Sequence, residues 1–356
     1  MQHEHGSSPR VTRVLSRLVA TCVFAALALA GAAWAAESRN TAAAATPATH
    51  AASGRTALRP SSANPALAAF RSLLPSSADV VLSVDLKTLR ASPLGPAIDA
   101  KVESFVQGDS RGRFSDQTGI DLKRDVDTVL AVRRPSGGSA EEGLLVLAKG
   151  RFSQTRIAEK AAAAGWTSTL RRGVRVLLAP PEPGRRDASP ASEALALPDG
   201  STLLFGSAAE VNRGLDVLSG SSRPEPQSGP FRAMLSAVDT AAPLWAAASG
   251  SFLKNVPSGL RARETSGAAA GVLSDLSSAR LMGWTGKDLS MKIQLDSRDE
   301  GSAGDLADTL RGAISAVKVS GQGGAWEILD TAKVTRSRKT VELTAKVTAS
   351  ALQGLP

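Results

Sequence analysis

Histidine and cysteine, the side chains most often used for nucleophilic catalysis and for binding zinc, are confined to the start of this 356-residue chain. The histidines are His3, His5 and His50, and the single cysteine is Cys22. The chain beyond residue 50 therefore lacks imidazole and thiol groups. This excludes Ser-His-Asp and Cys-His catalysis, His/Cys zinc sites, haem ligation and disulfides from a fold built on the later residues. No cofactor, metal-ligating residue or catalytic residue is assigned.

Two short patterns resemble hydrolase motifs. Ser251 and Lys254 have the Ser-x-x-Lys spacing of penicillin-binding enzymes, and Ser274-Asp275 and Lys339-Thr340 follow in the same order. That chemistry needs the serine and lysine on one buried helix, but Pro257 ends any helix three residues after Lys254. Gly108-Asp109-Ser110 matches a motif that requires a histidine base. Neither pattern predicts an enzyme here.

Carboxylates are the remaining groups able to do acid–base chemistry. An EF-hand over the cluster after residue 295 would need an oxygen ligand where Arg298 stands, so the start of a helix is favoured over a calcium site. Turns and helix caps explain the acidic residues near position 121. A glycosidase-like carboxylate pair stays open. The two groups are Asp296, Asp299, Glu300, Asp305 and Asp308, and Asp121, Asp125 and Asp127.

A secretory signal peptide is predicted over residues 1–35. Three arginines between positions 10 and 17 precede nineteen uncharged residues, 18–36, which end in small side chains. Cleavage is expected between Ala35 and Ala36. The alternative is an uncleaved membrane anchor, because a stretch of this length can just span a bilayer.

The positive charge of the chain is diffuse. Cleavage at Ala35 would leave 39 basic and 32 acidic residues, and the net charge would fall from +9 to +7. The closest clusters, Arg171-Arg172-Arg175 and Lys333-Arg336-Arg338-Lys339, fall in predicted hairpins without interleaved aromatic residues. A nucleic-acid surface would combine basic residues with stacking side chains, so these clusters favour solvated sheet edges. Nucleic acid is not an expected partner.

The folded body is expected to begin after a disordered tether of Ala, Thr, Ser and Pro over residues 36–63. Residues 64–220 form a first half, residues 221–230 a linker and residues 231–356 a second half. In both halves a helix and a strand precede a variable helix, a hairpin, a further helix and more strands. The fold class is α+β, with two related halves that each have a mainly antiparallel sheet and helices on one face. One irregular α+β domain is the alternative, and whether the halves share a sheet is left open.

Local signals place several of these elements. Ser153 and Ser207 are expected to cap helices, and Ser302 is expected to cap the long helix of the second half. Arg172-Gly173 is expected to turn a hairpin, and residues 289–295 alternate strictly between apolar and polar side chains, as in a strand with one buried face. Trp166, Trp245, Trp284 and Trp326 lie in or beside these elements, which favours core packing over a ligand groove.

Five stretches of the chain share a pattern of turns and core positions: 74–82, 118–126, 144–153, 173–174 and 203–207. In these stretches the chain resembles an uncharacterised family of exported bacterial proteins, a domain-of-unknown-function family with duplicated α+β halves. The likeness covers roughly residues 67–255. This chain departs from the pattern in having Arg172 where a tyrosine is expected before Gly173. The resemblance implies an envelope location and no known activity.

These observations favour an exported envelope protein, periplasmic or extracellular, with a non-enzymatic role in binding or scaffolding. The expected partner is an apolar ligand or another envelope protein. One alternative is a carboxylate-dependent envelope hydrolase with two carboxylates in one pocket. The other is a protein anchored to the inner membrane by residues 18–36, which would then be its only contact with a membrane.

Overall fold

The computed structural model describes residues 70–107, 112–135, 143–180, 193–225, 229–254, 275–320 and 325–354. The predicted signal peptide, its cleavage site at Ala35 and Ala36, and the predicted tether 36–63 lie outside the described residues. So do the three histidines, the cysteine and the Gly-Asp-Ser motif at 108–110. Among the described helices, none is long and apolar enough to cross a membrane.

The first half contributes seven strands and several short helices. Its strands are β1 (Val80–Asp85), β2 (Val126–Arg133), β3 (Leu144–Gly150), β4 (Thr167–Arg171), β5 (Val174–Leu178), β6 (Glu193–Asp199) and β7 (Thr202–Ser207). Its helices are η1 (Arg71–Leu73), α3 (Leu86–Ala91), α4 (Gly95–Gln107), α5 (Gly112–Thr118), α6 (Gln154–Ala163) and α7 (Ala208–Leu218).

The second half contributes five strands and the longest helix of the described chain. Its strands are β8 (Leu244–Ser249), β9 (Leu276–Thr285), β10 (Leu289–Ser297), β11 (Lys333–Ser337) and β12 (Thr340–Val347). Its helices are α8 (Gly229–Ser236), α9 (Gly250–Lys254), α12 (Glu300–Ser320), α13 (Ala325–Asp330) and α14 (Ala349–Gly354).

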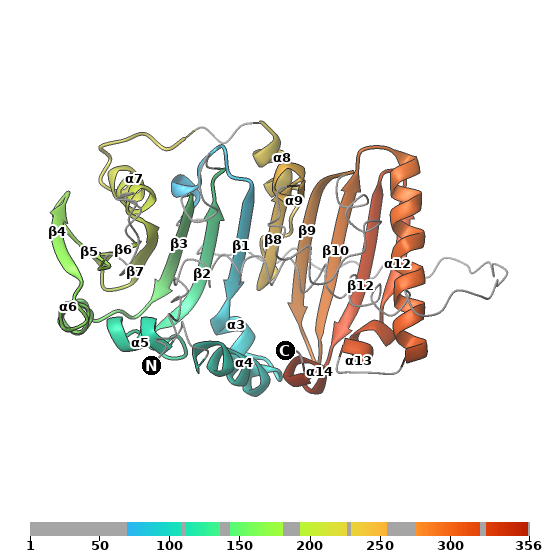
Figure 1. Cartoon of the computed structure of the whole chain (residues 1–356), viewed down its shortest axis with the longest axis horizontal. Coiled ribbons are helices and arrows are strands. Elements are labelled where there is room, and N and C mark those ends of the chain that lie inside the picture. Colours follow the sequence, from blue (N-terminus) through green and yellow to red (C-terminus); the bar gives the residue numbers. More distant parts are fainter. Residues whose placement is uncertain are drawn as a thin grey trace, which may run out of the picture.

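All twelve strands belong to one antiparallel sheet, in the order β11-β12-β10-β9-β8-β1-β2-β3-β7-β6-β5-β4 (Figure 1). The fold class is therefore α+β, as expected. The two halves meet where β1 pairs with β8, with Leu82 opposite Ala246. The strands follow outward in matching order from this centre, β2-β3-β7 on one side and β9-β10-β12 on the other. A duplication would produce this order, and the relationship of the two halves stays a prediction.

Helix starts follow local capping chemistry, with one difference from expectation. The Ser153 and Ser207 side chains accept hydrogen bonds from the main-chain N–H groups of Arg156 and Glu210, as N-caps do. The helix expected to begin at Ser302 begins earlier, at Glu300. Asp299 accepts from the Ser302 N–H at 2.8 Å, so the aspartate takes the capping role. A carboxylate at this position also complements the helix dipole.

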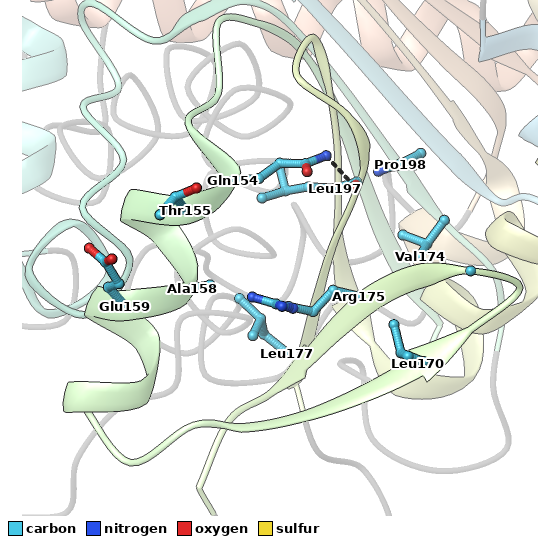
Figure 2. Close-up of a pocket in the computed structure, with 11 residues that line it drawn as sticks. Gln154, Thr155, Ala158, Glu159, Leu170, Val174, Arg175, Leu177, Leu197 and Pro198 are labelled. Atoms are coloured by element: carbon cyan, nitrogen blue, oxygen red, sulfur yellow. Dashed lines mark hydrogen bonds between the residues drawn. The ribbon is translucent and has the colours of Figure 1, made fainter.

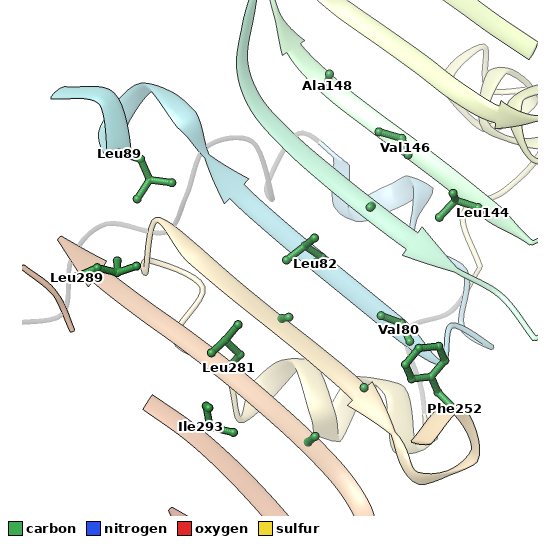
Figure 3. Packing of buried hydrophobic residues seen from close by; sticks show 14 of the residues in the cluster. Val80, Leu82, Leu89, Leu144, Val146, Ala148, Phe252, Leu281, Leu289 and Ile293 are labelled. Carbon is green, nitrogen blue, oxygen red and sulfur yellow. The ribbon is translucent and has the colours of Figure 1, made fainter. Parts of the chain in front are cut away.

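The sheet carries an apolar core on each face. One core joins alternate strand residues such as Leu82 and Leu281 to helices α3, α6, α9, α12, α13 and α14, and Figure 3 shows part of it around Phe252. The other packs η1, α7 and α8 against the opposite face around Trp245, which is fully buried. Helices were expected on one face only. Strands near the centre of the sheet are apolar on both faces, which requires cover on both sides.

The outer strands of the second half have one polar face. The core around Trp245 contains no described residue of β10, β11 or β12. On that face Asp296 accepts hydrogen bonds from Ser278, Arg280 and Thr340, at 2.6, 2.6 and 2.7 Å. The strict alternation of residues 289–295 therefore produces one apolar face and one solvated face, as predicted.

Candidate functional site

A groove opens at the β4 end of the sheet, between α6 and the β4–β5 hairpin (Figure 2). Its volume is about 560 Å³, which lies in the range typical of small-ligand sites. We call it the α6–hairpin groove. The residues that line it are Gln154, Thr155, Ala158, Glu159, Leu170, Gly173, Val174, Arg175, Leu177, Leu197 and Pro198.

Helix α6 forms one wall of the groove, because its apolar face packs on the core and its other side remains free to line the groove. Ile157 and Ala161 are fully buried in the core beneath the helix. Gly165, with φ of 83°, ends the helical segment, and the Trp166 indole that follows is buried and donates to Gln117. Residues 154, 155, 158 and 159 are consequently left on the side of the helix that lines the groove.

The opposite wall is a tight hairpin. Arg172 and Gly173 both have positive φ, 54° and 76°, as a two-residue type I′ turn requires. Leu170 and Arg175 are opposite each other in the β4–β5 register and share one face. Leu177 and Leu197 form an apolar floor and are 4% and 7% exposed, whereas Leu170 is 74% exposed. The groove thus has a buried apolar floor and an open apolar rim.

The positive charges of the hairpin differ in their surroundings. The Arg171 and Arg172 guanidinium groups both pair with Asp216, and their hydrogen bonds hold the pKa of Asp216 below its usual value. Arg175, exposed within the groove, has no ion pair or hydrogen bond with any described residue. Glu159 also lines the groove, and its carboxylate makes no ion pair with Arg175. Arg175 is therefore a cation available to a ligand.

Two described members of the Ser-x-x-Lys pattern, Ser251 and Lys339, make hydrogen bonds with residues outside the pattern. Ser251 and Lys254 lie on α9, a helix of five residues, and the Ser251 hydroxyl contacts Ser249 at 2.7 Å. Ser274 lies outside the described residues. Lys339, the remaining basic residue of the pattern, donates to the main-chain oxygen of Arg298 at 3.0 Å.

Several carboxylates of the two predicted clusters have structural partners. Asp121 accepts from the N–H groups of Lys123 and Arg124 in a turn, and Asp125 pairs with Arg156. In the second cluster Asp308 pairs with Arg311 on the same helix. Among the described residues, no group of three His, Cys, Asp or Glu side chains could hold a metal ion.

The tryptophans divide between core and periphery. Trp166 and Trp245 are buried, in agreement with core packing, and Trp284 is half-buried beside α8 with its indole N–H 3.3 Å from Asp239. The side chain of Trp326 lies outside the described part of the chain. The three described tryptophan side chains do not line the α6–hairpin groove.

The groove itself was not predicted from the sequence. The basic cluster at 171–175 was placed in a hairpin at a sheet edge, and the structure has it there. The missing information was the position of α6, whose buried Ile157 belongs to a core that includes residues of strands later in the chain. One local signal was present before the cluster: residues 167–170, Thr-Ser-Thr-Leu, carry no charge, whereas edge strands are commonly protected by charged side chains.

Comparison with known proteins gives a fold likeness and no family. No family model matches the chain, and no curated protein matches it. The solved structure of TP0453, in its crystal form I, is similar over 79% of this chain and 94% of that one, with 12% identity and a TM-score of 0.46. A likeness at this level carries no argument about function, so the case for a function rests on the groove.

Proposed function

We propose that this chain is an exported, non-enzymatic envelope protein that binds a ligand with apolar surface and negative charge in the α6–hairpin groove. The observation that carries the proposal is the combination of a buried apolar floor, an exposed Leu170 and a cation, Arg175, that has no partner among the described residues. An apolar group covering this floor and rim gains from leaving water, and a carboxylate or sulfonate gains from the guanidinium.

Export is supported by the pattern of residues 1–35, in which basic residues precede an uncharged stretch that ends at Ala35. The anchored alternative keeps the same folded body and differs only in whether that segment is removed. The two are distinguished by the first residue of the mature protein.

The hydrolase alternative requires two carboxylates facing one another across a pocket, about 5 to 9.5 Å apart. Glu159 is the single carboxylate among the described residues that line the α6–hairpin groove. The lining therefore favours binding over acid–base catalysis. Hydrolysis of glycosides or esters that is lost in Glu159→Gln would reverse this preference.

A direct test uses anilinonaphthalene sulfonate, a fluorescent probe that combines an apolar ring system with one negative charge. We expect saturable binding to the folded protein. Ala158→Trp places an indole in the groove and should weaken binding by at least about tenfold, or 1.4 kcal/mol. Ala163→Trp is the matched control, because Ala163 is exposed on the same helix and does not line the groove. Equal probe affinity in both variants would contradict the proposal.

A further inference from the structure

Strand β4 is the last strand of the sheet and has one open edge. It pairs with β5, and no other described strand lies beyond it (Figure 1). The two-residue turn at Arg172-Gly173 makes Arg171 and Val174 a hydrogen-bonded pair, and such pairs recur at every second residue. The N–H and C=O groups of Ser168 and Leu170 therefore point away from β5, toward the open edge.

The two edges of the sheet are protected differently. At the far end β11 carries Lys333 and Arg336, and charged side chains of this kind discourage pairing with another chain. Strand β4 begins Thr-Ser-Thr-Leu and carries no charge before Arg171. It contains no proline, and its first four residues are exposed. An edge without these protective features is a ready template for an added strand.

A second copy of this chain is a poor occupant of the edge. Pairing β4 with β11 of another molecule would bring the Arg171-Arg172-Arg175 cluster toward the Lys333-Arg336-Arg338-Lys339 cluster. Pairing two β4 strands would add a second arginine cluster to the first. Like charges across strands destabilise pairing, so the charge of this edge favours an acidic partner.

We infer that β4 receives an extended acidic peptide segment as a thirteenth strand, with its alternate side chains directed into the α6–hairpin groove. This inference rests on the proposed function and names its ligand class. Main-chain hydrogen bonds to Ser168 and Leu170 supply affinity, and the side chains supply selectivity. Because alternate residues of a strand share a face, an apolar residue can contact Leu170 while a carboxylate two positions away reaches Arg175.

The test uses a blocked synthetic peptide of sequence TVTETV, which presents two valines and one glutamate on one face of a strand. Binding to the full-length protein is measured by isothermal titration calorimetry. We expect Arg175→Gln to weaken binding by about fivefold, as for an exposed ion pair. The charge-matched control is Arg232→Gln, because Arg232 is exposed on α8 over the other face of the sheet. It should leave the affinity unchanged.

The main-chain contribution is tested separately. Ser168→Pro removes an outward N–H, a change that edge strands tolerate, and should weaken binding at least about tenfold. The same peptide with N-methyl groups on the residues that face β4 should not bind wild-type protein, a result that does not depend on the folding of any variant. Equal binding of the N-methylated peptide would overturn the inference.

Other outcomes would also overturn it. These are binding of anionic phosphatidylglycerol vesicles in place of the peptide, and self-association that buries β4 and excludes the peptide. If anilinonaphthalene sulfonate binds and Ala158→Trp blocks it while the peptide does not bind, the proposed function stands and the peptide inference fails. If neither the probe nor the peptide binds, both fail.

Discussion

Replacing Arg133 by glutamine should be among the most damaging single substitutions in this fold. Arg133 ends β2 next to the centre of the sheet, and its Nη1 lies 3.2 Å from Oδ2 of Asp79. The two side chains are only 16% and 7% exposed. The guanidinium also lies over the ring of Phe252, 5.1 Å from its centroid. The substitution removes the neutralising charge from a buried carboxylate.

The expected cost follows from how poorly Asp79 is solvated. Its Oδ1 atom is buried and makes no hydrogen bond within the described structure. Burial raises the pKa of Asp79 above its usual value, although the charge of Arg133 acts in the opposite direction. Breaking a buried pair by removing one partner costs about 3–5 kcal/mol, and we expect Arg133→Gln to fall in this range at neutral pH.

Asp79→Asn should cost less, about 1–2 kcal/mol. It removes the charge that burial penalises, keeps an acceptor oxygen for Arg133 and leaves the contact with Phe252 intact. Both variants break the same ion pair, but only Arg133→Gln leaves a buried carboxylate without a neutralising charge. The difference between their unfolding free energies therefore measures the cost of that buried charge.

The pH dependence of the unfolding free energy also distinguishes Arg133→Gln from Asp79→Asn. A raised pKa in the folded state means that the stability contributed by Asp79 is fully present below 3.8 and is lost as the pH rises through the folded value. Without Arg133 the folded pKa rises further, so the cost of Arg133→Gln should shrink as the pH falls from about 7 toward about 4. In Asp79→Asn this component of the pH dependence should disappear.

Urea unfolding, followed by the tryptophan fluorescence to which the buried Trp166 and Trp245 contribute, measures these free energies. The reasoning is refuted if Asp79→Asn costs as much as Arg133→Gln at neutral pH. It is also refuted if the cost of Arg133→Gln does not change with pH.

Two further expectations follow from the structure and one from the sequence. Partial burial alone would raise the pKa of Glu225, but hydrogen bonds from Ser76 and the charge of Arg134 hold it below its usual value. Glu225→Gln should therefore cost about 1–2 kcal/mol above pH 4.5 and little below the folded pKa. Unfolding at two pH values checks this, and an equal cost at both would contradict it. Gly150→Ala should destabilise the sheet by about 3 kcal/mol in urea unfolding, because a Cβ would lie 1.8 Å from the Asp125 carbonyl oxygen, whereas Gly200→Ala meets no atom closer than 3.7 Å. Equal costs for these two substitutions would be evidence against that account. N-terminal sequencing of the mature protein should give Ala36 as the first residue, and a start at Met1 would favour the anchored form.

Elements with strong local signals were predictable. Ser153 and Ser207 cap the helices expected of them, and the hairpin expected at Arg172-Gly173 forms between β4 and β5. These features depend on hydrogen bonds and backbone angles within a few residues, which the sequence encodes directly. The cap of α12 was placed at Ser302 because serine and aspartate compete for this role, and Asp299 has it.

Contacts between distant segments were not predictable in the same way. The apolar runs of β1 and β8 indicate that both strands are buried but do not say which strand lies beside which, so their pairing could not be inferred. The α6–hairpin groove could not be inferred for the same reason, because it is formed by segments that are separated in the sequence. Its floor, Leu177 and Leu197, comes from strands β5 and β6, and its wall comes from a helix that precedes both in the chain.

The sequence by itself determined that the body beyond residue 50 works without imidazole or thiol, that it is α+β, and that its basic clusters belong to sheet edges. Composition and short-range periodicity suffice for such statements. Only the tertiary structure decided that the halves share one sheet, that helices cover both faces of its centre, and that β4 is an open edge beside a groove. These features arise from strand pairing and packing between segments far apart in the chain, where many partners satisfy the same local pattern and the burial of the whole sheet selects one.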